Sequence, residues 1–368
     1  MASHSNTGGA QRTISLGLQG GGAHGAFSWG VLDALLEDGR YDFDGISGTS
    51  AGAMNAIVMA NGLMTGGKIG AIKALKAFWQ GVAASVPLDL SMPVDGGEGV
   101  ALLPTTKMLL SWTQYFSPYQ MNPLNFNPLR KLLDVQVDFG GLRKHSPVRL
   151  FIAATNAKTG KLRLFRHPEI NADTIVASAC LPMIHQAVVI DGEPYWDGGY
   201  SANPAVFPLF NECESRDIML ILLAPQDYGE MPRTAEEIRA RTLEFAFNTS
   251  LLREMLLFAH VLNYGNDNER TQKKEDSGWS LLRLLGRSRQ EMATLPSLER
   301  QMLETRFHLI EAEDLLRQFG SATKIAADWS FLKKLHDIGY EKTQTWLAEH
   351  GDQVGKETSF DLIARFGG

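Results

Sequence analysis

The chain has 368 residues, of which 44% are hydrophobic and 21% charged, with a formal net charge of −6. That length suits one large α/β domain with an appendage, or two domains of ordinary size. The acidic balance gives no electrostatic reason to bind nucleic acid, and the apolar runs are shorter than the roughly 20 residues that a membrane-spanning helix needs. These observations set aside nucleic-acid-binding and membrane-spanning proteins.

The start of the chain and its cysteines favour a cytoplasmic location. Residues 1–12 lack the basic start and apolar core of a secretory signal, and we expect a disordered tail there. Cys180 and Cys213 have no CxxC spacing, which argues against a disulfide framework or a thiolate metal site and suits a reducing compartment. Peripheral contact with the inner membrane surface is compatible with this location.

Two strand–turn–helix units are predicted near the start. Residues 13–19 alternate between apolar and other side chains, as a strand does, and are followed by the glycine-rich stretch 20–25 and a helical pattern over 27–38. Residues 43–47 predict a second strand, which ends in a sharp turn at 48–52. This alternation of strands and helices indicates a largely parallel sheet.

Strands are predicted through the middle of the chain. The apolar segments 148–155, 161–166, 188–196 and 218–224 are separated by turn residues, and 172–179 has the pattern of a short helix. A β hairpin is expected within 188–196, because Asp-Gly is common in such turns.

The C-terminal part is predicted to be helical. Residues 235–264 and 296–350 have helical patterns, with no strand expected among them. The segment 84–128 mixes Pro, Gly and Asn with aromatic residues, which is typical of a lid or cap. We therefore predict a catalytic domain at 13–225 and a helical extension at 226–368.

Ser50 is the candidate nucleophile. It lies in the sequence Gly-Thr-Ser-Ala-Gly at 48–52, which fits GxSxG between a strand and a helix. Small flanking residues allow a turn so tight that the hydroxyl clears the backbone and faces the N-terminus of the helix. An ordinary Gly/Ser turn is the alternative.

The glycine-rich stretch 20–25 has two functional interpretations. Its free amides could bind the oxyanion of an acyl-transfer intermediate. It also fits the dinucleotide-binding pattern GxGxxG, with Asp42 or Asp44 at a suitable distance for a ribose. The stretch 41–45 is a poor buried strand, which disfavours a dinucleotide-binding oxidoreductase.

Asp197 is the candidate base. It precedes two glycines at the end of an apolar strand, although Asp-Gly is also common turn chemistry. A carboxylate followed by glycines can approach a serine without obstruction. Because an ordinary aspartate, with a pKa of about 3.9, is a weak base, we expect a partly desolvated pocket that raises its pKa.

This order of motifs resembles the patatin-like phospholipases over the whole predicted catalytic domain. The resemblance implies a three-layer α/β/α fold with a largely parallel sheet, no metal and no organic cofactor. It implies a lipid acyl hydrolase of the phospholipase A or lysophospholipase type, acting through a dyad of Ser50 and Asp197. The oxyanion hole would be formed by Gly20, Gly21 and Gly22.

His24 departs from the arginine that many family members carry at this position. Histidine titrates near neutrality, so any electrostatic help from His24 would depend on pH. A part in the proton relay and a plain packing role both stay open, so His24 is treated as a candidate accessory residue.

Substrate contact and the final reaction step also allow alternatives. The aromatic segment 109–119 and the basic segment 266–290 are candidates for contact with a membrane, since a phospholipid substrate lies in a bilayer. An acyltransferase would use the same acyl-enzyme with another acceptor. A catalytically silent lipid-binding protein of the same fold is a further alternative.

Overall fold

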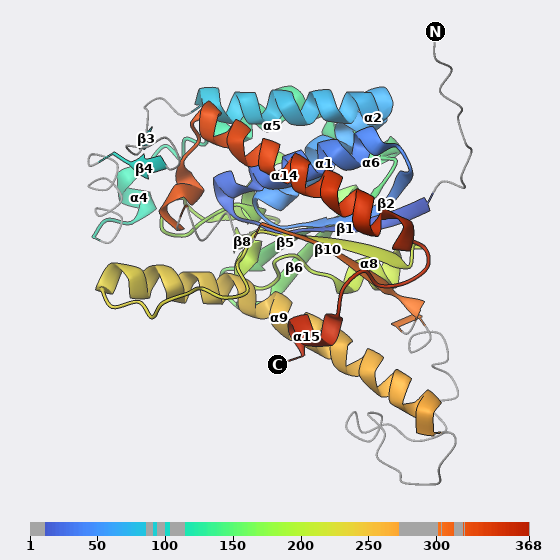
Figure 1. Ribbon diagram of the computed structural model, residues 1–368. Helices are drawn as coiled ribbons and strands as arrows, with labels where there is room; N and C mark the ends of the chain where they lie inside the picture. The colour runs from blue at the N-terminus through green and yellow to red at the C-terminus, as the bar shows by residue number, and fades with distance from the viewer. Residues whose placement is uncertain are drawn as a thin grey trace.

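A mostly parallel β-sheet lies between two layers of helices (Figure 1). The computed structural model describes residues 12–85, 91–93, 100–103, 115–271, 301–302, 304–312, 319 and 321–367. Within these ranges, no helix is long and apolar enough to cross a bilayer. Residues 1–11 of the predicted tail, most of the segment 109–119 and most of the segment 266–290 lie outside the described residues. Arg12, also expected in the tail, is instead the first residue of a strand.

The main sheet has the strand order β10-β9-β1-β2-β5-β8-β7, with β6 also paired to β5. The neighbours from β10 to β5 are parallel, whereas β6, β7 and β8 pair in antiparallel fashion. The strand bounds are β1 Arg12–Leu18, β2 Tyr41–Gly48, β5 Arg149–Asn156, β6 Leu162–Arg166, β7 Val188–Ile190, β8 Glu193–Asp197, β9 Asp217–Leu222 and β10 Arg306–Glu311. A separate antiparallel pair consists of β3 Ser91–Pro93 and β4 Val100–Leu102.

The helices cover both faces of this sheet. One core joins the sheet to α1 Gly25–Asp38, α2 Ala51–Ser85, α5 Pro128–Gln136, α6 Phe139–His145, α7 Ala172–Ser178 and α14 Trp329–His350. A second core joins the opposite face to α8 Phe207–Glu212, α9 Ala235–Thr271 and α15 Leu362–Phe366. The remaining short helices are α4 Pro118–Met121, η1 Gly22–His24, η2 His167–Glu169, η3 Gly198–Tyr200, η4 Ser321–Ile325 and η5 Gly351–Gln353. The predicted mixed α/β fold is confirmed.

Strand register brings the two N-terminal turns to one edge of the sheet. Leu18 at the end of β1 lies beside Gly48 at the end of β2. Gly48 in turn is level with Ile152 of β5, and β8 places Asp197 beside Ala154, two residues further along the same strand. The glycine loop and the serine turn meet at this edge because β1 and β2 are parallel and end together. The antiparallel strand β8 brings Asp197 to the same region through its register with β5.

Two expectations about strands were wrong. Residues 306–311, expected within a helical region, form β10, where buried Phe307 and Ile310 extend the sheet beside β9. Pairing with a distant parallel strand overrides the local helical pattern here. Residues 41–45, expected to be a poor buried strand, begin β2, since Tyr41 and Phe43 pack into the core.

The C-terminal segment is packed closely against the catalytic part of the chain. A Cβ on Gly30 of α1 would lie 1.9 Å from the carbonyl oxygen of His336 in α14, and one on Gly339 would lie 2.1 Å from that of Phe27. The two helix backbones therefore touch at paired glycines. Together with β10, this contact makes the extension part of the same layered structure (Figure 1).

Candidate active site

The turn between β2 and α2 holds Ser50 in a strained backbone conformation. Its φ is 54°, in the left-handed region that few non-glycine residues adopt. A Cβ on Gly48 would lie 2.6 Å from the carbonyl oxygen of Gly52, and one on Gly52 would lie 2.2 Å from that of Leu18. The turn therefore requires glycine on both sides of the serine, as in a nucleophile elbow.

Hydrogen bonds fix the backbone around Ser50. Its own amide donates to Oγ of Ser178 at 3.0 Å, and the hydroxyl of Thr49 donates to the carbonyl oxygen of Ala202 at 2.8 Å. Helix α2 begins at the next residue, Ala51, so its positive N-terminal end adjoins the serine. The serine turn is thus tied both to α7 and to the loop that follows Asp197.

Asp197 is held at the end of β8 by its backbone and by its side chain. Its amide donates to the carbonyl oxygen of Cys180 at 2.8 Å, and its carbonyl oxygen accepts from the hydroxyl of Thr155 at 2.8 Å. Oδ1 accepts from the amide of Gly199 at 2.8 Å. The side chain is buried beside Ser50, so the structure brings the two predicted catalytic residues together.

Burial sets the basicity of Asp197. Desolvation raises the pKa of its carboxyl group to about 7, while hydrogen bonds from the Gly199 amide and the Ser50 side chain oppose that rise. Oδ2 has no hydrogen bond of good geometry to any residue that the structure describes. A carboxylate with such a pKa and a free oxygen can accept a proton near neutral pH.

The glycine loop lies directly against the serine turn. A Cβ on Gly20 would lie 2.7 Å from the carbonyl oxygen of Thr49 and 2.9 Å from Cβ of Ser50. The Gly20 amide is taken, since it donates to Asn203. The amides of Gly21 and Gly22 donate to no residue within the described ranges, which leaves them available to a bound oxyanion.

Comparison with known proteins assigns the family. A family model described as patatin-like phospholipase matches residues 16–210, more than half of the chain. The chain belongs to this family. Its members are lipid acyl hydrolases, and the matched region contains the serine turn, Asp197 and the glycine loop. The predicted resemblance is confirmed.

No curated protein matches this patatin-like chain. Among solved structures, that of VipD from Legionella pneumophila is similar, with 15% sequence identity and a TM-score of 0.41. The match covers 95% of this chain and 70% of the VipD chain.

His24 of the patatin-like domain is a buried neutral ring. Its Nε2 lies 2.8 Å from Oγ1 of Thr323 in η4, and its edge contacts Phe331 of α14. Burial, with a smaller contribution from Lys324, lowers the pKa of the imidazole to about 3. The geometry thus joins His24 to the C-terminal segment, and no hydrogen bond in the described ranges joins it to Ser50 or Asp197.

Three polar residues that support the site were not predicted from the sequence. Asn203 accepts from Gly20 at 2.7 Å, Ser178 accepts from Ser50, and Oε1 of Gln19 accepts from the amides of Leu223 and Ala224 at 2.6 and 2.7 Å. Gln19 directly precedes the glycine-rich stretch, and this position in the sequence could have indicated a role in supporting the loop. Ser178 and Asn203 have no spacing that predicts their partners.

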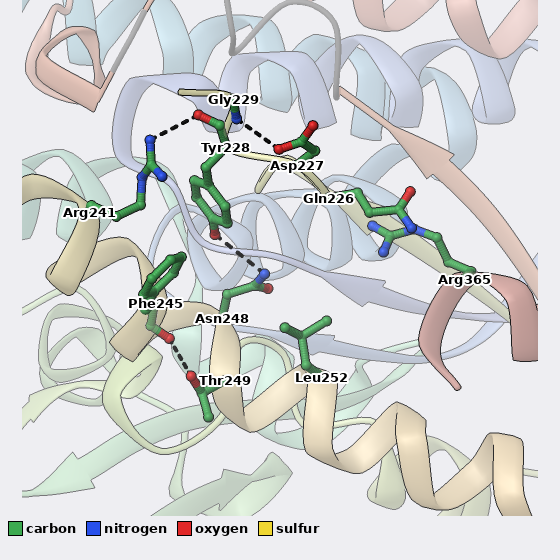
Figure 2. A pocket seen from close by; sticks show the side chains of 10 residues that line it. All are labelled: Gln226, Asp227, Tyr228, Gly229, Arg241, Phe245, Asn248, Thr249, Leu252 and Arg365. Atoms are coloured by element: carbon green, nitrogen blue, oxygen red, sulfur yellow. Dashed lines mark hydrogen bonds between the residues drawn. The ribbon is translucent and has the colours of Figure 1, made fainter. Parts of the chain in front are cut away.

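A cavity of about 510 Å³ lies beside the N-terminal half of α9, with Tyr228 and Asn248 among the residues that line it (Figure 2). Its wall residue Asn248 accepts from Nε2 of Gln19 at 3.3 Å and donates toward the hydroxyl of Tyr228 at 3.4 Å. The two arginines in the wall have partners: Arg241 bonds to backbone carbonyl oxygens, and Arg365 pairs with Glu311. The cavity is thus linked through Asn248 to Gln19, which precedes the glycine loop, and neither Ser50 nor Asp197 lines it.

The described part of the chain also lacks a metal-ligand cluster. No group of three or more His, Cys, Asp or Glu side chains there is arranged to hold a metal ion.

Proposed function

We propose that this protein hydrolyses ester-linked acyl chains of lipids through a dyad of Ser50 and Asp197. The observation that carries the proposal is a buried carboxylate, with a pKa raised to about 7, beside a serine held at positive φ in a GxSxG turn. A general base works best when its pKa lies near the working pH. Membership of the patatin-like family supports lipid esters as the substrate class.

Acylation begins with transfer of the Ser50 hydroxyl proton to the Asp197 carboxylate as Oγ attacks the ester carbonyl carbon. The carbonyl oxygen becomes an oxyanion, which the amides of Gly21 and Gly22 stabilise. Gly20 is not an oxyanion donor, because its amide donates to Asn203. Its lack of a side chain instead allows the glycine loop to lie close to the serine turn. Collapse of the intermediate returns the proton from Asp197 to the leaving alcohol and leaves an acyl-serine.

Deacylation repeats these steps with water. Asp197 takes a proton from the attacking water, and the same amides hold the second oxyanion. When this intermediate collapses, Oγ of Ser50 leaves and takes the proton back from Asp197, while the fatty acid is released. One carboxylate therefore serves both half-reactions, first as base and then as acid.

The dinucleotide-binding alternative conflicts with the strand register. Asp42 lies beside Thr13 at the start of β1, whereas the glycine loop follows Leu18 at its end. Asp44 is bonded to Arg149 and to the amide of Ser215. Neither acid can reach a ribose whose phosphates lie at the glycine loop, since a strand separates them.

The test is fatty acid release from a panel of phospholipids, lysophospholipids, diacylglycerols and short p-nitrophenyl esters. Wild type should release fatty acid from at least one lipid class, and Ser50→Ala should release none. The preferred class then distinguishes phospholipase A from lysophospholipase activity. Equal hydrolysis by wild type and Ser50→Ala would contradict the proposal.

We place this activity in the cytoplasm. Cys180 and Cys213 are free and buried, which is compatible with a reducing compartment.

A further inference from the structure

Two segments without charged residues lie close to the catalytic residues in the fold. Residues 115–129 and 174–190 contain no Asp, Glu, Lys or Arg, in a chain of which 21% of residues are charged. Several large apolar side chains in these two segments are exposed: Tyr115, Phe116, Tyr119, Leu124, Phe126 and Met183. The most exposed is Leu124, at 91%. Exposed apolar groups gathered in this way indicate a binding surface rather than scattered surface residues.

The two segments form one surface because hydrogen bonds join them. Nε2 of Gln186 donates to the carbonyl oxygen of Asn122 at 2.7 Å. The amide of Ala187 donates to the hydroxyl of Tyr119 at 3.4 Å. We call residues 115–126 and 183–189 together the apolar rim. Its α4 lies at one end of the molecule, beside β3 and β4 (Figure 1).

The apolar rim continues directly from the catalytic residues. Ser178, which accepts from the Ser50 amide, and Cys180, which accepts from the Asp197 amide, lie a few residues before exposed Met183. The segment that joins Ser178 to Met183 contains no charged residue. The rim therefore continues, along the chain, from residues that contact the catalytic pair.

The most exposed part of the rim is a turn with internally satisfied polar groups. The side chain of Asn122 accepts from the amide of Phe126 and donates to its carbonyl oxygen, both at 2.9 Å. The amide of Asn125 donates to the carbonyl oxygen of Asn122 at 3.0 Å. These bonds present Leu124 and Phe126 at the tip and lower the cost of moving the turn out of water.

A cation adjoins this turn. Nζ of Lys131 lies 5.1 Å from the ring centroid of Phe126, and Lys131 forms no ion pair with any residue that the structure describes. An unpaired ammonium behind an apolar tip complements an anionic lipid headgroup above an acyl layer. A surface that binds a folded protein partner more often has charged residues around its edge and is enriched in arginine.

We propose that the apolar rim is the surface by which this protein docks on lipid bilayers, with Leu124 and Phe126 inserted and Lys131 at the headgroups. This inference rests on the proposed hydrolase function, because it holds that the enzyme takes its lipid substrate from a bilayer rather than from solution. It locates the contact at residues 115–126 and 183–189, beside the serine.

The test measures partitioning onto vesicles in the Ser50→Ala background, so that the vesicles are not digested. Leu124→Glu and Phe126→Glu should each weaken binding to phosphatidylcholine vesicles about tenfold or more. Lys131→Glu should remove the additional binding gained when phosphatidylglycerol is included. Ile69→Glu and Leu257→Glu, at comparably exposed apolar positions on α2 and α9, are the matched controls and should bind as the background does.

A second readout separates docking from chemistry. In the otherwise wild-type chain, Leu124→Glu should lower the rate on vesicles about tenfold relative to the rate on a dissolved p-nitrophenyl ester. Rim variants that bind vesicles as well as their background would overturn the inference, as would no vesicle binding by the parent chain. Absence of ester hydrolysis by wild type would instead count against the proposed function, and the binding experiment does not depend on it.

Discussion

The amide of Gly20 donates to Oδ1 of Asn203 at 2.7 Å, which joins the loop after β1 to the loop after β8. The same asparagine donates through Nδ2 to the carbonyl oxygen of Phe247 at 3.1 Å, so α9 is attached to this junction. Asn203 thereby holds the glycine loop at a fixed position relative to Asp197, and catalysis should depend on it although it takes no part in bond making.

Asn203→Ala should therefore lower kcat by about 10²-fold, because small displacements of an oxyanion donor are costly. Asn61→Ala is the matched control, since Asn61 is also buried and bonded to backbone groups but lies away from the serine. For Asn61→Ala, urea unfolding should show lost stability, and steady-state kinetics should show a near-normal kcat. A normal kcat for Asn203→Ala would show that the junction does not position the loop.

The raised pKa of Asp197 predicts how activity depends on pH. The carboxylate is the active form, so kcat/KM should rise with pH and level off above an apparent pKa of about 7. His24, with its pKa lowered to about 3, is already neutral across this range and should not contribute. The profile of His24→Gln should keep the same midpoint; a shifted or lost midpoint in that variant would assign the titration to the histidine.

Burial of Asp197 should also cost stability at high pH. A carboxyl whose folded pKa, about 7, exceeds its ordinary value of 3.8 binds a proton more tightly in the folded state. The protein therefore loses stability as pH rises between these two values. Asp197→Asn removes the buried charge and should be more stable than wild type above pH 7, on the order of 2–4 kcal/mol, with little advantage near pH 4. Urea unfolding at both pH values measures this, and a pH-independent difference would contradict it.

The positive φ of Ser50 predicts a difference between two inactive variants. Glycine adopts this conformation freely, whereas alanine keeps the Cβ that makes it unfavourable. Ser50→Gly should therefore be more stable than Ser50→Ala by about 1 kcal/mol in the free energy of unfolding. Equal stability would mean that the turn relaxes when the serine hydroxyl is removed.

Much of the catalytic edge could be predicted from sequence because its signals are local. The alternation at 13–19 places Ile14, Leu16 and Leu18 in one core, and the structure confirms this. The glycine-flanked serine and the aspartate at a strand end are likewise short patterns. The glycine loop and the serine turn meet because parallel strands end at one edge. Asp197 joins them through the antiparallel pairing of β8 with β5, which that rule does not predict.

The features that could not be predicted from the sequence depend on contacts between segments that are far apart in the chain. The strand β10 is stabilised by pairing with β9 rather than by its own pattern, and α14 packs on α1 through Gly30 and Gly339. His24 lies beside the glycine loop in sequence, yet its partner Thr323 is far along the chain in the C-terminal extension. No local pattern encodes such a partner, so the role of His24 stayed open until the fold was known.

The most direct test of the Ser50–Asp197 dyad is labelling with a fluorophosphonate, followed by identification of the modified residue. Wild type should be labelled at Ser50, Ser50→Ala should not react, and Asp197→Asn should react at least about 10²-fold more slowly. Labelling of Asp197→Asn at the wild-type rate, or modification of a different residue, would contradict the account.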